Sequence, residues 1–156
     1  MSHAPSRVRF PGCPLAVLGR TLCGLAGLVF LAVLVTATRI DPDPRGYGTH
    51  EQLGLSPCGF HLVFNIPCPS CGATTSFAHF VRGQWRSAMT TNAGAFALAF
   101  VSLLAAPWLL ASAVGGRLWF INEPFQVFFG VGVALTVIAL SHWLIRIVHS
   151  TGRFAG

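Results

Sequence analysis

The stretch AGAFALAFVSLLAAPWLLASAV, residues 93–114, decides the fold of this chain. It contains 22 residues, and none of them is charged. An α-helix rises about 1.5 Å per residue, so a helix of this length crosses the roughly 30 Å apolar core of a lipid bilayer. Pro107 predicts a local kink, which neighbouring helices in a membrane tolerate. The stretch therefore predicts a transmembrane helix.

Two further apolar runs are long enough to cross a membrane. Residues 124–145 have the same length, and residues 21–38 form a shorter run bounded by Arg20 and Arg39. A basic leader before the shorter run and small residues at 35–37 are also typical of a secretory signal peptide, so a cleaved signal stays open as an alternative there. The sequence thus predicts an all-α integral membrane protein with three transmembrane helices.

The composition of the whole chain supports this class. Of its 156 residues, 53% are hydrophobic and only 9% are charged, against about 25% charged in soluble domains. The net charge of +6 comes from arginines that stand singly at the edges of apolar runs, a pattern typical of a membrane surface and not of a nucleic-acid binder. We expect one membrane domain, residues 1–156, in a multi-pass protein of the cell membrane that contacts the lipid bilayer and binds no nucleic acid.

The loop between the first two predicted spans, residues 39–92, has an unusual composition. Residues 52–81 carry no formal charge, although a solvated loop of that length normally carries several. Pro57, Pro67 and Pro69 prevent a continuous spanning helix. This pattern predicts a segment that lies at the membrane interface or enters the membrane and returns on the same side.

The same loop contains the sequence Cys-Pro-Ser-Cys at residues 68–71. Proline is favoured at the first position of a helix, so Pro69 predicts a helix over residues 69–82, ended by Gly83. Both thiols would then lie at a helix N-terminus, where the helix dipole favours thiolate over thiol. This position suits disulfide exchange or metal ligation.

From this motif onward the chain resembles a family of small bacterial membrane proteins of unknown function, which is marked by Cys-Pro-x-Cys-Gly-x-Thr, then a basic residue and Gly, and later Ala and Asn. The matching positions are Cys68, Pro69, Cys71, Gly72, Thr74, Arg82, Gly83, Ala88 and Asn92. The resemblance covers about residues 55–148. Members of the family often have a basic residue where this chain has Thr75. The resemblance implies a membrane location and no established activity.

A first interpretation of the cysteines is a metal site. Cys58 and His61 are separated by two residues, as are Cys68 and Cys71, and six residues separate the two pairs. Zinc accepts three sulfurs and one nitrogen in a tetrahedral arrangement. A metal ion also folds a loop that has little other core. The spacing therefore makes these four residues a candidate zinc site.

Two other interpretations stay open. Cys68 and Cys71 have the spacing of a redox-active pair, and outside the cytoplasm they would also form a structural disulfide, with Cys58 left as a resolving or unpaired thiol. Alternatively, the cysteines only pack as small apolar residues at a tight helix start, as we expect for Cys13 and Cys23.

Polar and small residues also predict how the spans begin and pack. Asn92 is expected to cap the second span. Gly24 and Gly27 offer a small surface for close helix packing, as do Gly130 and Gly132.

No motif of a known enzyme class accompanies the cysteines. The sequence contains no phosphate-binding loop, nucleophile elbow or dinucleotide fingerprint. We therefore favour a non-enzymatic accessory or scaffold protein whose cysteine loop is locked by a disulfide or a metal and contacts a membrane protein or a second copy. The alternative is a membrane thiol-disulfide oxidoreductase that uses Cys68 and Cys71. The basic leader favours a cytoplasmic N-terminus and an outward-facing loop.

Overall fold

The computed structural model describes residues 12–64 and 66–152. Three of its helices are long and apolar enough to cross a membrane, which confirms the predicted fold class. They are α1 (Val17–Arg39), α5 (Ala93–Gly115) and α6 (Pro124–Gly152). Each helix contains one of the predicted apolar runs, and α1 and α6 extend beyond the predicted ends.

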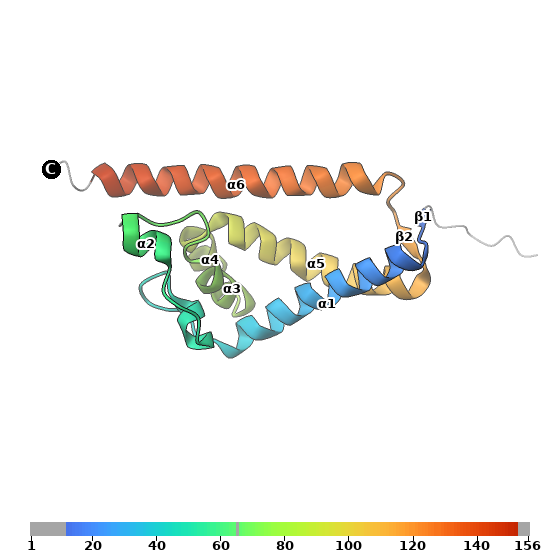
Figure 1. Cartoon of the computed structure of the whole chain (residues 1–156), viewed down its shortest axis with the longest axis horizontal. Helices are drawn as coiled ribbons and strands as arrows, with labels where there is room; N and C mark the ends of the chain where they lie inside the picture. Colours follow the sequence, from blue (N-terminus) through green and yellow to red (C-terminus); the bar gives the residue numbers. More distant parts are fainter. Residues whose placement is uncertain (1–11, 65, 153–156) are drawn as a thin grey trace, which may run out of the picture.

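Helices α1 and α5 meet at one end of the molecule (Figure 1). There, Arg20 of α1 donates from Nε to the carbonyl oxygen of Ala113 at 2.9 Å and from its terminal nitrogen to that of Val114 at 3.2 Å. These carbonyls belong to the last turn of α5, so the guanidinium lies at the negative end of the helix dipole. Arg20 thereby fixes the position of α1 against α5.

Close packing between α1 and α5 depends on a glycine. A Cβ atom at Gly27 would lie 2.8 Å from the side chain of Leu110 and 3.2 Å from the carbonyl oxygen of Ala106. A Cβ atom at Gly24 would lie 3.7 Å from the side chain of Ala113, an ordinary contact distance. The predicted packing role of these two glycines is confirmed.

Two short strands close the same end of the molecule. Strand β1 (Gly12–Pro14) pairs antiparallel with β2 (Arg117–Trp119), so that Cys13 lies opposite Leu118. Leu118 and Cys23 are buried in one small cluster with Leu109. The strand pair was not expected from the sequence, because its residues are too few to show an alternating pattern.

At the other end α1 and α5 diverge, and short helices fill the space between them (Figure 1). The helices in this space are α3 (Ala73–Val81) and α4 (Trp85–Thr91), and the same loop contains η1 (Thr49–Leu53) and α2 (Gly59–Phe64) outside it. The buried cluster here joins α1, α3, α4 and α5 through Leu34, Ala37, Phe77, Phe80, Ala88, Ala95 and Ala99. The loop over residues 39–92 is thus a packed assembly of short helices, consistent with an interfacial segment.

The predicted helix over residues 69–82 is wrong at its beginning. Residues 69–72 form a turn, and α3 begins at Ala73. Gly72 has a φ of 83°, which a right-handed helix cannot include. Both thiols of the Cys-Pro-Ser-Cys motif therefore precede α3 and do not lie in its first turn. The C-terminal prediction is confirmed, because α3 ends at Val81 and Gly83 has a φ of 74°.

Helix α6 runs back along the molecule to the cysteine loop (Figure 1). It approaches α5 closely at Gly94, where a Cβ atom would lie 2.6 Å from that of Ala139. None of the side chains between Pro124 and His149 is buried. A Cβ atom at Gly130 or Gly132 would meet nothing within 4 Å, so the predicted packing role of these two glycines is not found within the described chain.

Candidate metal centre

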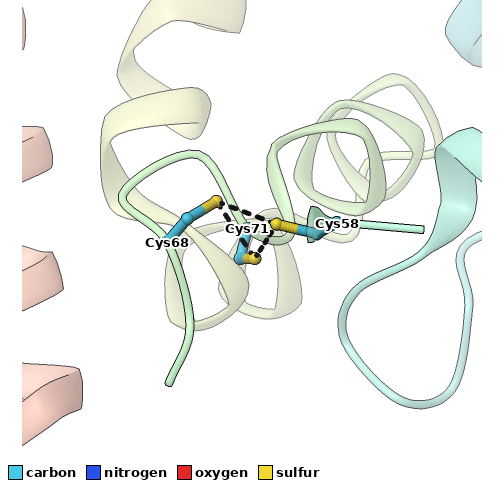
Figure 2. A group of neighbouring side chains, drawn as sticks. All are labelled: Cys58, Cys68 and Cys71. Atoms are coloured by element: carbon cyan, nitrogen blue, oxygen red, sulfur yellow. Dashed lines mark hydrogen bonds between the residues drawn. The ribbon is translucent and has the colours of Figure 1, made fainter. Parts of the chain in front are cut away.

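Three thiols from the cysteine loop lie together (Figure 2). The Sγ atoms of Cys68 and Cys71 are 3.1 Å apart, and the Sγ atom of Cys58 is 3.6 Å from each of them. Within residues 12–64 and 66–152, this is the one group of three or more potential metal ligands whose ligand atoms all lie within 4.8 Å of one another. Cys13 and Cys23 are free and lie in the cluster near the strand pair.

Local backbone geometry brings the three sulfurs together. Cys58 directly precedes α2, and its Sγ atom accepts hydrogen bonds from the backbone N–H groups of His61 and Phe60. Cys68 and Cys71 flank a tight turn in which the N–H of Cys71 donates to the carbonyl oxygen of Cys68 at 3.0 Å. The turn faces both sulfurs toward Cys58 (Figure 2).

The distances between the sulfurs match those of a thiolate metal site. A zinc–sulfur bond of about 2.3 Å gives a tetrahedron whose sulfurs are about 3.8 Å apart. The observed separations of 3.1–3.6 Å are only a few tenths of an ångström shorter. Small side-chain rotations would therefore admit an ion between the three sulfurs.

The three thiols do not share one environment. Burial raises the pKa of the Cys71 thiol to about 12. The backbone N–H of His61, which donates to the sulfur of Cys58, lowers the pKa of that thiol below its ordinary value. Cys58 is therefore the more readily ionised thiol, and Cys71 keeps its proton near neutral pH unless a cation replaces it.

His61 lies beside this group but not within it. Its ring packs edge-on against Tyr47, with the two ring centroids 5.1 Å apart. Its Nδ1 atom is buried and has no hydrogen-bond partner among the described residues. His61 and the three cysteines line the same cavity. The structure thus brings three of the four predicted ligands together and leaves the fourth at the edge of the site.

The cavity beside the thiols has a volume of about 610 Å³. Arg45, Tyr47, His50 and Glu51 line it together with the cysteines. Arg45 is held by both Glu51 and Asp43, at 3.2 and 2.8 Å. The hydrogen bonds from Arg45 lower the pKa of the Asp43 carboxyl group. This ion-paired loop forms one wall of the candidate metal centre.

Residues from the second and third spans hold the cysteine turn in place. Asn92 caps α5 as predicted, because its Oδ1 atom accepts the N–H of Ala95 at 2.9 Å. Its Nδ2 atom also donates to the carbonyl oxygens of Pro69 and Cys71, each at 3.1 Å. One side chain therefore connects the start of a transmembrane helix to the candidate site.

Helix α6 holds the turn from the other side. Trp143 donates from Nε1 to the carbonyl oxygen of Pro67 at 2.7 Å, and Arg146 donates to that of Cys71 at 2.8 Å. Neither residue was expected from the sequence to support the turn. A single arginine near the end of an apolar run is the signal that was available, but it gives no partner by itself.

One family comparison covers the candidate site. Residues 58–106 match a family described as "Protein of unknown function (DUF2752)". The match agrees with the expected resemblance to a family of unknown function, over a shorter part of the chain than residues 55–148. The matched residues include the three clustered cysteines, His61 and the first part of α5. No curated protein and no solved structure matches the chain.

Proposed function

We propose that this chain is a non-enzymatic membrane protein whose DUF2752 domain binds one zinc ion through Cys58, Cys68 and Cys71. The observation that carries the proposal is the three sulfurs at 3.1–3.6 Å from one another. Zinc in structural sites is bound mainly by thiolates and imidazoles, and such a cluster of free thiols supplies three of its four ligands.

His61 is the proposed fourth ligand. Its Nδ1 atom is buried and has no hydrogen-bond partner in the described part of the chain, which costs free energy unless the atom binds something. His61 also lines the same cavity as the three cysteines. A rotation of the ring away from Tyr47 would bring a ring nitrogen toward the sulfurs and complete a closed, four-ligand structural site.

A bound ion would fix the cysteine loop against the transmembrane helices. The carbonyl oxygens of Pro67, Pro69 and Cys71 already accept hydrogen bonds from Asn92, which caps α5, and from two residues of α6. A metal that closes the loop would therefore stabilise the packing of three separate elements at once. We infer an accessory or scaffold role, in which the locked loop contacts another membrane component.

Metal analysis of the detergent-purified chain tests the zinc proposal. We expect about one zinc per chain, and at least a tenfold loss of zinc affinity in each of the three variants Cys58→Ser, Cys68→Ser and Cys71→Ser. His61→Ala should bind zinc more weakly than the wild type, through the three thiolates alone. Cys13→Ser and Cys23→Ser remove thiols outside the cluster and should keep full zinc content. A wild-type chain that takes up less than half an equivalent of added zinc contradicts the proposal.

A thiol-disulfide oxidoreductase is the second candidate function. It is favoured by the shortest sulfur pair, Cys68 and Cys71 at 3.1 Å, and by the lowered pKa of Cys58 beside it. The Cys68–Cys71 pair would transfer two electrons and two protons to a substrate disulfide, which becomes two thiols while the pair becomes a disulfide. In that case Cys68→Ser or Cys71→Ser traps a mixed disulfide with the substrate, whereas the zinc proposal expects no trapped partner.

A further inference from the structure

Arg146 carries a positive charge that has no carboxylate partner in the described part of the chain. It lies on α6 and is partly buried, and one terminal nitrogen donates to the carbonyl oxygen of Cys71 at 2.8 Å. The ion pairs found among the described residues are made by Arg45 and Arg82 instead. A partly buried guanidinium is costly unless an anion accompanies it.

The acidic residues of the chain leave no carboxylate for Arg146. The sequence contains only four acidic residues. Three of them lie at this end of the molecule and are already paired, as Asp41 with Arg82 at 3.0 Å, Asp43 with Arg45 at 2.8 Å and Glu51 with Arg45 at 3.2 Å. The fourth, Glu123, precedes α6 at the opposite end of that helix. Among the described residues, no carboxylate side chain is therefore available to accompany Arg146.

A cavity beside Arg146 has room for such an anion. Its volume is about 440 Å³, and no carboxylate lines it. The lining residues are Arg45, Tyr47, His61, Pro67, Cys71, Arg146 and His149. Arg146 and His149 are three residues apart on α6, so both face this cavity from neighbouring positions on one side of the helix.

The position of the cavity along α6 indicates the source of the anion. Arg146 follows Pro124, the first residue of α6, by 22 positions. At about 1.5 Å per residue this places it roughly 33 Å along the helix, at the second edge of the hydrocarbon layer. Phosphate groups of lipids lie at this level, and basic pockets between transmembrane helices bind lipid headgroups.

We propose that the cavity between the end of α6 and the cysteine loop binds a phosphate group, with the guanidinium of Arg146 as its main ligand. Arginine binds phosphate through two parallel N–H donors, which gives this ion pair its strength and direction. The phosphate is carried by an anionic phospholipid or is free in solution. Arg146 is not one of the proposed zinc ligands, but Cys71 and His61 also line this cavity, so zinc content has to be followed alongside anion binding.

Lipid retention tests the proposal on the full-length protein. The chain is incorporated into nanodiscs of phosphatidylglycerol or of phosphatidylcholine, and the lipid that stays bound after transfer to detergent is counted by native mass spectrometry. We expect the wild-type chain to retain phosphatidylglycerol and Arg146→Gln to retain at least tenfold less. Addition of inorganic phosphate to the lipid-loaded chain distinguishes the sources, since phosphate displaces the lipid only if the site also accepts the free ion.

Two variants control the test. Arg86→Gln removes the same charge from an exposed position on α4, outside the cavity, and should retain the lipid like the wild type. Arg146→Lys keeps the positive charge and should retain an amount of lipid between those of the wild type and Arg146→Gln. This variant still tests the proposal if Arg146→Gln does not fold. Zinc content is measured in the same samples, so that a variant that loses only the anion is distinguished from one that also loses the metal. Equal retention of lipid and of phosphate by wild type and both Arg146 variants would overturn the proposal.

Discussion

Gly72 determines the shape of the cysteine turn. Its φ of 83° lies in the left-handed region, and a Cβ atom there would lie 2.6 Å from the carbonyl oxygen of Gly46. Glycine is thus required at this position for two separate reasons: the backbone is left-handed, and there is no room for a Cβ atom. It ends the turn that presents Cys71 and lets α3 begin at the next residue.

Substitution of Gly72 by alanine tests both requirements. Gly54→Ala is the matched control, because Gly54 has a φ of 76° and a Cβ atom added there would meet nothing within 4 Å. We expect Gly54→Ala to lose about 1 kcal/mol of unfolding free energy from backbone strain alone. Gly72→Ala adds an overlap with a backbone oxygen that cannot rotate away, and should lose about 3 kcal/mol. If thermal unfolding gave the same loss of unfolding free energy for both variants, the predicted overlap with the carbonyl oxygen of Gly46 would be contradicted.

Thr75 is a position at which the chain departs from the family that it resembles. That family often has a basic residue here, so no role of that charge carries over to this chain. Here Thr75 is fully buried, and its Oγ1 atom lies 2.8 Å from that of Thr49, which also accepts the backbone N–H of Asp43. A buried hydroxyl pair replaces the charge, and only the contact between η1 and α3 reveals it.

The ion pair of Asp43 makes the wall of the candidate site sensitive to acid. Hydrogen bonds from Arg45 lower the pKa of Asp43 in the folded chain. The resulting stabilisation is complete above the unfolded pKa of about 3.9 and is lost as the pH falls through the lower folded value. The protection factors of the amides of residues 43–51, which compare measured with intrinsic exchange at the same pH, should therefore fall below about pH 4 in the wild type.

Asp43→Asn checks this assignment. The variant has no carboxylate to protonate, so exchange over residues 43–51 should be faster than wild type at neutral pH and should change less in acid. Glu123→Gln, at the opposite end of the molecule, serves as the control and should exchange like the wild type in this loop. If the change in exchange on acidification persisted in Asp43→Asn, that change would have to come from another titrating group.

At the level of elements, the sequence predicts the three spans well and the short helices poorly. Long uncharged runs such as residues 93–114 specify a membrane helix by composition alone. The short helices between residues 39 and 92 have too few turns for a clear period, and the left-handed Gly72 moves the start of α3 away from Pro69. The three thiols could be predicted as ligands from their spacing. The hydrogen bonds that Asn92 and α6 donate to the cysteine turn could not, because they depend on tertiary contacts.

The contact between α5 and α6 depends on one small residue. A Cβ atom at Gly94 would lie 2.6 Å from the Cβ atom of Ala139 and 2.8 Å from its Cα atom. We expect Gly94→Ala to lose about 1–3 kcal/mol of unfolding free energy, because the two helices must separate to admit the methyl group.

Gly130→Ala is the matched control for this contact. Gly130 is a helical glycine of α6 with nothing within 4 Å of the added Cβ atom. Its substitution should leave the unfolding free energy unchanged or raise it by up to about 1 kcal/mol, because alanine has the higher helix propensity. A comparable loss in Gly130→Ala would instead indicate that this face of α6 packs against a second copy or another membrane protein.

For the whole molecule, the arrangement of the spans fixes which features share a side of the membrane. Helix α6 returns to the end of the molecule that holds the cysteine loop, where Trp143 and Arg146 bond to the turn. The candidate metal centre, the phosphate cavity and the end of α6 therefore face one side. The start of α1 and the strand pair face the other side (Figure 1).

Reporter fusions test this topology and locate the metal centre. Three spans require a reporter before α1 and a reporter after α6 to lie on opposite sides of the membrane. The basic leader favours a cytoplasmic start of α1, so green fluorescent protein fused before α1 should fluoresce and alkaline phosphatase fused after α6 should be active outside. An impermeant maleimide should then label the cysteine loop in intact cells after chelation of zinc. If both reporters lay on the same side, the number of spans would be even, and α6 could not return to the cysteine loop across the membrane.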